Sequence, residues 1–388
     1  MGERVVEWSG LPKELLEMIG KSLDTRVDVL RFRSVCSSWR SSTPHSHAHS
    51  PRFPLKFPSP YIALESASMS RTPVHLCEST LYLLQPLNPF PTSTSSCCSK
   101  GWLINVQESN SGKLRLLDPL SHRYIGYFPL DYAKMLNLVS FRIVELSKAY
   151  TLRDQIVIGP TSKRERKCIL SYRFAHGVKK AVLFPNSAWT SADECVVFVI
   201  FHGGKLACAK FGDEEWTFVD DGIHDDIIVY KGQLYVVCRL GIVSRIEYPS
   251  SNLVQFSPRL HGSICHKHLV ESCGDLYVVD RHAYLGRLHT FDIKVYKLDA
   301  ERGQWGSVTS LGDRAFVLGT ASSFSVSAQE FFGYQGNCIY FTDYQSKSCV
   351  FKLKDHSIGR LAFFTEHSHP FCPPPTWLSP TNPRSSTC

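Results

Sequence analysis

The sequence lacks the marks of a secreted or membrane-spanning protein. Residues Met1 to Arg4 carry no apolar segment of a signal peptide, and no Asn-x-Ser/Thr acceptor occurs in the 388 residues. The longest apolar run, Cys195 to Phe201, is far shorter than the roughly 20 residues that span a bilayer. We therefore expect a soluble protein of the nucleus or the cytoplasm, without a membrane partner.

The fourteen cysteines show no metal-binding or redox spacing. No Cys-x-x-Cys pair occurs, so neither a zinc ribbon nor a thioredoxin-like motif is indicated. We interpret the adjacent Cys97 and Cys98 as part of a loop. In a reducing compartment most of these cysteines would act as small buried hydrophobic residues.

Local catalytic signatures are missing as well. No Gly-x-Ser-x-Gly, His-Glu-x-x-His, Gly-x-x-x-x-Gly-Lys or Gly-x-Gly-x-x-Gly segment occurs. The densest set of candidate zinc ligands is His261, Cys265, His266 and His268. A strand would send Cys265 and His266 to opposite faces, where they could not easily share one metal. We expect no catalytic residue, no metal and no cofactor.

Charge is spread thinly along the chain. The formal net charge of +8 is modest for this length and does not indicate a nucleic-acid partner. We interpret the basic run Lys163 to Lys167 as an exposed loop, with nuclear import as the alternative. The acidic groups Asp213–Glu215, Asp220–Asp221 and Asp225–Asp226 could bind a basic partner or calcium. No calcium-loop spacing occurs among them, so we interpret all three as solvated turns.

Three short amphipathic segments begin the chain. Leu11, Leu15, Leu16 and Ile19 fall on one stripe of a helix, with Pro12 at the first helical position. Second and third helices are predicted over residues 27–34 and 35–42. Helices this short cannot bury so many apolar side chains among themselves, so the surplus must face a partner or the rest of the chain.

This arrangement resembles the F-box, in which Leu-Pro, Leu-Leu and Ile precede a run ending Val-Cys-x-x-Trp-Arg. The matching residues, in order, are Leu11-Pro12, Leu15-Leu16, Ile19, Leu23, Asp28-Val29-Leu30, Val35-Cys36 and Trp39-Arg40. The resemblance implies docking on the Skp adaptor, and through it on the cullin scaffold, of a Skp–cullin–F-box ubiquitin ligase. The residues we expect on the docking surface are Leu11, Pro12, Leu15, Leu16, Ile19, Leu30, Val35, Cys36 and Trp39. The alternatives are an ordinary helical cap on the larger domain, or a DNA-binding helix-turn-helix.

The rest of the chain divides into a linker, a β-rich domain and a tail. Residues 44–60 hold five prolines, with histidines at 45, 47 and 49, and are predicted to form a stiff, extended linker. Residues 61–378 consist of short β-rich runs such as Phe141–Leu146 and Glu194–Phe201, bounded by turn residues. Residues 379–388 are a C-terminal tail. With the F-box placed at residues 7–43, the fold class is mainly β.

A recurring unit favours a β-propeller over a sandwich. Two or three apolar residues, a turn with Gly, and then Leu or Ile with Tyr recur around Gly232, Gly274 and Gly336, with a shorter echo at Gly204. Each unit is typical of the inner hairpin of a blade, with Gly supplying a positive φ in the turn. About six kelch-like blades are expected from the length, with five or seven as alternatives.

Several segments resemble the β-propeller of plant F-box proteins of the SKIP/Kib type. They are Lys100-Gly-Trp102-Leu-Ile, Leu114-Arg-Leu-Leu-Asp-Pro119-Leu, Gly336-Asn-Cys-Ile-Tyr340, Val350-Phe-Lys-Leu and Pro373-Pro-Pro-Thr-Trp377. The resemblance implies a non-catalytic substrate-recognition subunit, whose propeller binds an unknown target protein for ubiquitination. The alternatives from the residues alone are a stand-alone propeller scaffold with a helical cap, a propeller enzyme, and a nucleic-acid binder.

Overall fold

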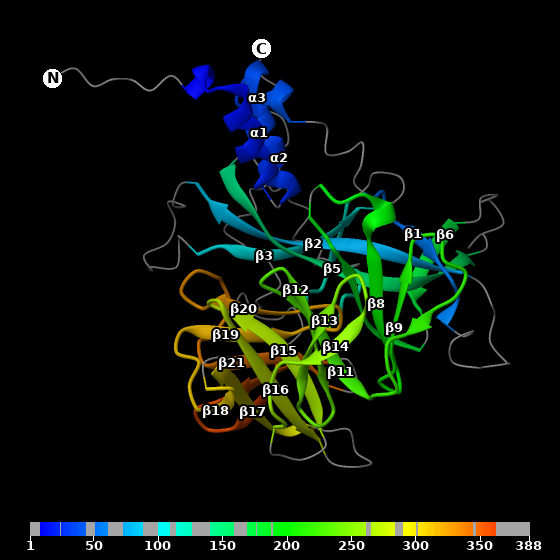
Figure 1. Ribbon diagram of the computed structural model, residues 1–388. Coiled ribbons are helices and arrows are strands. Elements are labelled where there is room, and N and C mark those ends of the chain that lie inside the picture. Colours follow the sequence, from blue (N-terminus) through cyan, green and yellow to red (C-terminus); the bar gives the residue numbers. More distant parts are fainter. Residues whose placement is uncertain are drawn as a thin grey trace, which may run out of the picture.

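The computed structural model describes residues 8–23, 25–43, 51–60, 73–87, 100–108, 114–125, 140–158, 169–175, 177–187, 189–260, 265–283, 290–299, 302–343 and 347–361. These residues form a small helical unit followed by a mainly β ring of sheets (Figure 1). The helices lie outside the ring, beside the strands β2 (Val74–Pro86) and β3 (Trp102–Glu108) (Figure 1). The predicted fold class, mainly β with N-terminal helices and a propeller, is confirmed.

The helical unit contains a 3-10 turn, Trp8–Gly10, and three helices, α1 (Lys13–Lys21), α2 (Arg26–Ser34) and α3 (Ser37–Ser42). Helix α2 begins at a conventional cap, because the Thr25 hydroxyl accepts the backbone N–H of Asp28 at 3.1 Å. Leu16 and Val29 are fully buried and centre a small core. Gly20 packs so closely that a Cβ there would lie 2.2 Å from Thr43 Cγ2. Close contact through small residues is how so short a bundle holds together.

Two predicted helix starts differ from the structure. Pro12 is the N-cap of α1 rather than its first helical residue. The third helix begins at Ser37 instead of Val35, because Val35 caps the end of α2 and Cys36 is extended, with φ of −160°. Val35 and Cys36 therefore lie in the short connection between two helices.

Five sheet units make up the ring within the described residues. Three are antiparallel meanders of four strands, in which each strand pairs with the next along the chain. Their strands are β7 (Val178–Phe184), β8 (Val196–Phe201), β9 (Leu206–Lys210) and β10 (Thr217–Phe218); β11 (His224–Tyr230), β12 (Gln233–Cys238), β13 (Val243–Glu247) and β14 (Asn252–Gln255); and β15 (His266–Ser272), β16 (Asp275–Ala283), β17 (Thr290–Asp299) and β18 (Gln304–Val308).

The other two units are less regular. In one, the meander β21 (Cys338–Thr342), β22 (Ser348–Lys352) and β23 (Ser357–Arg360) is extended by β19 (Arg314–Leu318), which pairs with β21 in parallel, and by β20 (Ser323–Ser327). In the other, β2, β3 and β4 (Leu114–Leu117) are joined by β5 (Phe141–Ile158), with β1 (Leu55–Phe57) and β6 (Ile169–Phe174) at the ends of β2 and β5. Five units match one of the blade numbers that the sequence allowed beside the preferred six.

The predicted linker ends earlier than residue 60. Leu55–Phe57 form β1 and pair with β2, and the ring of Phe57 stacks on Trp216 with centroids 6.0 Å apart. The Trp216 indole N–H also donates to the carbonyl of Pro58 at 3.1 Å. Apolar side chains at 55 and 57 reach the core, so this part of the proline-rich segment belongs to the sheet.

Hydrophobic clusters fill the spaces between successive units. Along β8, Val197 and Val199 belong to the cluster shared with β2 and β5, whereas Phe198 and Ile200 belong to the cluster shared with β11. Further clusters join β11–β14 to β15–β18, β15–β18 to β19–β23, and β19–β23 to β2–β4. A run that is apolar on both faces is what a strand between two neighbouring units requires, and the prediction that residues 195–201 form a buried strand is confirmed.

The ring is closed by backbone hydrogen bonds between its first and last units. Gly101 donates to the carbonyl of Glu330 at 2.6 Å, and Phe332 donates to the carbonyl of Gly101 at 2.8 Å. Nearby, Thr320 donates to the carbonyl of Leu120 at 2.8 Å. These bonds join the two ends of the ring, while the outermost strands β10, β14, β18 and β23 remain as short edges.

The predicted inner-hairpin turns are confirmed at two of the repeated glycines. Lys231 and Gly232 join β11 to β12 with φ of 48° and 70°, and Cys273 and Gly274 join β15 to β16 with φ of 53° and 82°. Two consecutive positive φ values are the signature of the two-residue turn that suits the twist of paired strands. At the third site it is Asn337, with φ of 58°, that takes the left-handed conformation instead of Gly336.

Candidate functional site

The helical unit exposes large apolar side chains to solvent. On α1, Leu15, Met18 and Ile19 fall on one stripe, and Met18 is 67% exposed. Trp8, Leu30 and Val35 are also exposed. These six residues are called the exposed helix residues below. Isolated surface hydrophobic residues are common, but a concentration of them on so small a unit marks an interaction site.

The structure divides the predicted docking residues into two groups. Leu15, Ile19, Leu30 and Val35 are exposed, as is Pro12 at the start of α1, and Leu11 and Cys36 are half-buried. Leu16 is fully buried, so its side chain packs inside the unit. Trp39 is half-buried: its ring lies 4.6 Å from Phe32 and its indole N–H donates to the carbonyl of Trp8 at 3.0 Å. Leu16 and Trp39 therefore pack inside the helical unit and hold the exposed residues in position.

Two exposed residues were not predicted. Met18 lies three residues after Leu15 and one before Ile19, a spacing that places it on the same stripe. Trp8 precedes α1, and its carbonyl is held by Trp39. The helical spacing was a usable signal for Met18. The position of Trp8 could not be predicted from the local sequence pattern, because it depends on a hydrogen bond with Trp39, which lies 31 residues further along the chain.

The inner side of the helical unit meets the propeller through hydrogen bonds. The Arg31 guanidinium donates to the carbonyl of Ile143 on β5. The Trp189 indole N–H donates to the carbonyl of Leu23 at 3.0 Å. These contacts involve α2 and the residues before it, which leaves the stripe on α1 uncovered.

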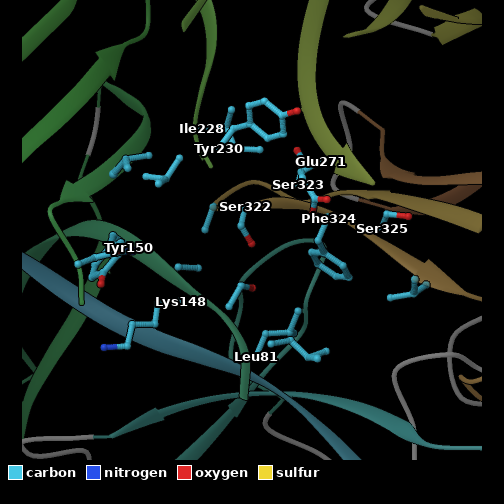
Figure 2. A pocket seen from close by; sticks show the side chains of 18 of the residues that line it. Leu81, Lys148, Tyr150, Ile228, Tyr230, Glu271, Ser322, Ser323, Phe324 and Ser325 are labelled. Carbon is cyan, nitrogen blue, oxygen red and sulfur yellow. The ribbon is translucent and has the colours of Figure 1, made fainter. Parts of the chain in front are cut away.

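The centre of the ring contains two cavities, which share lining residues such as Tyr150, Lys180 and Ala321. The first has a volume of about 710 Å³. Figure 2 shows Lys148 and Tyr150 of β5, Tyr230 of β11, and Glu271 of β15 around this common space. The hydroxyls of Ser147 and Ser323 in its wall are buried without a hydrogen-bond partner among the described residues. This cavity lies toward the end of β5 that meets the helices.

The second cavity, of about 730 Å³, opens at the other end of the channel and is called the distal cavity below. All five units contribute to its wall. Its charged side chains are Arg123, Lys179, Lys180, Asp225, Asp226 and Arg281, and the imidazoles of His202 and His268 line it as well. A concave site of this volume is the size that proteins use for small ligands.

Buried ion pairs hold the carboxylates of this cavity. Lys180 bonds to Asp226, and Lys179 Nζ lies 3.2 Å from Asp225 Oδ1. Burial acts to raise the pKa of Asp225, but its hydrogen bond from His266 and the charge of Lys179 outweigh burial and hold that pKa well below its usual value. Each carboxylate of the cavity therefore lies against a lysine of β7.

Two β-bulges bring these four adjacent charged residues to the same side of their strands. The pairing of β7 with β8 shifts between Val178 and Lys180, and the pairing of β11 with β12 shifts between His224 and Asp226. An extra residue at a bulge breaks the strict alternation of faces. The bulges thus let each lysine of β7 reach one aspartate of β11, Lys179 with Asp225 and Lys180 with Asp226.

The prediction that all the acidic groups are solvated turns is wrong for Asp225–Asp226. Both residues lie in β11 and are almost fully buried. Residues 213–215 and Asp221 are exposed, as expected of solvated turns. The difference arises because the neighbouring strands bring lysines and backbone N–H groups to residues 225 and 226, which makes burial of their charge tolerable.

The predicted candidate zinc ligands separate in the structure. His266 Nδ1 lies 3.4 Å from Asp225 Oδ1, whereas His268 lines the distal cavity. Residue 261 lies outside the described residues, as do Cys97 and Cys98, the histidines at 45, 47 and 49, the basic run at 163–167 and the proline segment at 373–377.

None of the described helices has both the length and the apolar character to cross a membrane.

Comparison with known proteins identifies similar chains from a plant. The profile of the KIB1-4 β-propeller family matches residues 72–359. F-box protein At2g26160 of Arabidopsis thaliana is 30% identical over 364 residues, covering 89% of this chain and 98% of that protein. Putative F-box protein At1g65770 of the same plant is 33% identical, covering 90% and 92%. F-box protein SKIP23, also from Arabidopsis thaliana, is 28% identical, covering 97% and 96%.

Among solved structures, the Cps50 (Swd1) β-propeller domain of Myceliophteria thermophila covers 74% of this chain and 90% of its own, at a TM-score of 0.32 and 11% identity. At that score the likeness adds nothing to what the family profile and the sheet topology establish.

Proposed function

The chain belongs to the KIB1-4 β-propeller family, and on that premise we propose that it is the substrate-recognition subunit of a Skp–cullin–F-box ubiquitin ligase. Its relatives from Arabidopsis thaliana are named as F-box proteins. In this role the helical unit binds a Skp-type adaptor, the propeller binds a target protein, and the other subunits transfer ubiquitin. The chain acts by raising the effective concentration of the target at the site of transfer.

The exposure of the helix residues is the observation that carries this proposal. An ordinary cap would turn its apolar stripe toward the propeller, where burial would stabilise it. Here Arg31 and Trp189 join the helical unit to the propeller by hydrogen bonds, and the apolar stripe of α1 is exposed. An apolar stripe that stays exposed to solvent fits a surface that binds a partner protein better than it fits a cap.

A non-catalytic role is supported by the chemistry of the distal cavity. Asp225 and Asp226 are bound by lysines of β7 and by backbone N–H groups of β15, so their oxygens are already engaged within the ring. Burial lowers the pKa of His268 to about 3, far below the range useful to a general base. These groups stabilise the ring and shape a binding surface.

The cysteines support a reducing compartment, the nucleus or the cytoplasm. All nine cysteines among the described residues are free thiols. Five of these, Cys77, Cys195, Cys208, Cys338 and Cys349, are buried in the sheets. Buried thiols of this kind act as small core residues and need no oxidising environment.

The adaptor interaction is tested with a charge placed on the exposed stripe. Ile19→Glu is compared with Ile358→Glu, since the two isoleucines are 41% and 39% exposed and Ile358 lies on the outermost strand β23. We expect Ile19→Glu to weaken binding of a purified Skp adaptor at least about tenfold, because it buries an unpaired charge at the interface. Ile358→Glu should bind as the wild type does, and both should melt as the wild type does.

A second variant tests the Leu-Pro segment. Replacing both Leu11 and Pro12 with Ala should abolish co-purification with the adaptor while the propeller stays folded. If both variants retain full adaptor binding, the helices are a cap and the chain is a stand-alone scaffold.

Proximity labelling under proteasome inhibition then compares the intact chain with the Leu11/Pro12 variant. True targets should be labelled by both and ubiquitinated only with the intact chain.

A further inference from the structure

The distal cavity contains a half-buried arginine, Arg281, that makes no ion pair among the described residues, although the charge of Asp343 partly offsets its burial. Arg281 lies on β16, and its Nε donates to the Thr290 hydroxyl at 2.5 Å. Its guanidinium lies over the ring of Phe341, 4.7 Å from the centroid. Among the described residues no carboxylate comes within ion-pair distance of Arg281. Most of its donor capacity therefore remains for a ligand.

Burial makes this charge costly in the absence of a counter-ion. Desolvation lowers the pKa of Arg281 from its ordinary value of 12.5 to about 10, so the group stays protonated at neutral pH. An anion bound in the cavity would offset part of the desolvation free energy of the guanidinium. Arginine is also the side chain best suited to planar or tetrahedral oxyanions, because its fork of N–H groups matches their oxygens.

His268 supplies a second unsatisfied polar group in the same wall. Its Nε2 is buried and has no hydrogen-bond partner in the described part of the chain. Burial lowers the pKa of His268 and keeps the imidazole neutral; the charge of Asp226 opposes this effect, and the charges of Arg281, Lys179 and Lys180 add to it. A neutral imidazole can donate one N–H to an oxyanion that the neighbouring cations attract.

The carboxylates of the cavity do not cancel this positive charge. Four cationic side chains line the cavity, Arg123, Lys179, Lys180 and Arg281, against the two carboxylates of Asp225 and Asp226. Both carboxylates are paired with lysines of β7. Asp225 also accepts the backbone N–H of Lys267 at 3.3 Å, and Asp226 accepts that of Leu269 at 2.8 Å. With both lysines paired, Arg281 supplies the wall with positive charge that these two carboxylates do not neutralise.

The rest of the wall is apolar. Phe174, Val178, Leu152 and Leu318 line the cavity beside the charged group, and Phe174 is 40% exposed. A ligand that fills about 730 Å³ would therefore meet a charged wall and a hydrophobic wall at once. This combination favours a small molecule over a surface segment of a protein, because the lining residues come from all five units around one concave space.

We propose that the distal cavity is a binding site for a small organic anion, a phosphate or carboxylate attached to an apolar or aromatic body. Arg281 and His268 bind the anionic group, and the side chains around Phe174 contact the apolar body. The site is independent of adaptor docking, because it lies at the end of the channel away from the helices.

Phenyl phosphate tests the proposal by saturation-transfer difference NMR on the purified full chain. Phenol serves as the neutral matched probe and inorganic phosphate as the anion without the body. We expect saturation transfer from the protein to phenyl phosphate, weaker competition by inorganic phosphate, and no signal from phenol at the same concentration. Arg281→Gln should weaken binding at least about tenfold, the effect of losing one charge-assisted hydrogen bond.

Two further variants keep the result interpretable. Arg245→Gln removes an arginine on β13 that does not line the cavity, and it should bind phenyl phosphate as the wild type does. Thr320→Trp fills the cavity mouth from an exposed residue and leaves the buried charges in place, so it should block binding without lowering the melting temperature. Equal binding by wild type and Thr320→Trp, or an equal signal from phenol, would overturn the proposal. Binding of a long phosphoserine peptide with no binding of phenyl phosphate would overturn it in favour of a protein ligand.

Discussion

Lys180 and Asp226 form a buried ion pair that joins two neighbouring units of the propeller. Lys180 lies on β7 and Asp226 on β11, and their side chains are 8% and 2% exposed. The second carboxylate oxygen of Asp226 accepts the backbone N–H of Leu269 on β15 at 2.8 Å. A single carboxylate therefore connects three successive units of the ring.

Asp226→Asn should destabilise the ring by about 3 to 5 kcal/mol, because it leaves Lys180 as an uncompensated buried charge. Urea unfolding measures the loss. The matched control is Lys297→Gln, which removes an ion pair with Asp275 in which both side chains are 43% exposed. Such surface pairs contribute about 1 kcal/mol or less. Similar losses in the two variants would contradict a structural role for the buried pair.

Acid should destabilise the protein in part through His122. Burial, and then the charge of Arg153, lowers the pKa of His122 to about 3. The unfolded residue titrates near 6.5. Between these values the unfolded chain binds a proton that the folded chain does not, so this contribution to stability is complete above about pH 6.5 and is lost as the pH falls. At pH 5 the loss amounts to about 2 kcal/mol.

His122→Asn tests this contribution, since Asn tolerates the positive φ of 55° at this residue. Urea midpoints at pH 8 and pH 5 should show that the variant loses about 2 kcal/mol less than the wild type over this range. An unchanged pH dependence would exclude His122 as a source of acid sensitivity.

Two glycine turns should respond differently to alanine. Gly232 has a φ of 70° and open space around the position of a Cβ, so Gly232→Ala should cost only the conformational penalty, about 1 kcal/mol. At Gly204, with φ of 87°, a Cβ would lie 3.0 Å from the carbonyl oxygen of His224. Gly204→Ala should cost about 2 to 4 kcal/mol, because backbone atoms cannot easily move aside. Thermal unfolding of both variants checks the order, and the reverse order would show that steric contact is not the deciding term.

Trp39→Ala and Met18→Ala should separate stability from binding. Trp39 packs on Phe32 and holds Trp8, so its removal should destabilise the helical unit by up to about 3 kcal/mol and weaken adaptor binding indirectly. Met18 is 67% exposed, and Met18→Ala should leave stability within about 0.5 kcal/mol while it weakens adaptor binding. Melting curves and an adaptor titration measure the two effects. Adaptor binding by Met18→Ala at wild-type strength would remove Met18 from the proposed surface.

The sequence predicted elements best where the pattern is local. The helices were expected from the spacing of Leu11, Leu15 and Ile19, and they begin within two residues of the predicted positions. The turn at Gly232 was predicted from a glycine between two apolar runs. The strand β5 was predicted only as far as Leu146, yet it continues to Ile158, because its second half is stabilised by pairing with β2 and β6. Pairing with strands distant in sequence leaves little local signal.

The sequence by itself determined that this chain carries an apolar helical unit followed by a propeller of short strands. Helical stripes, buried strands and glycine turns can be recognised because each depends on residues that are close together in the sequence. Only the tertiary structure decided that Leu16 points inward while the adjacent Leu15 stays exposed. It also decided that Lys179, Lys180, Asp225 and Asp226 meet in the channel, since that meeting requires a bulge in each of two strands. A bulge is set by the register against a partner strand, and it is the packed ring, rather than the local sequence, that selects the register.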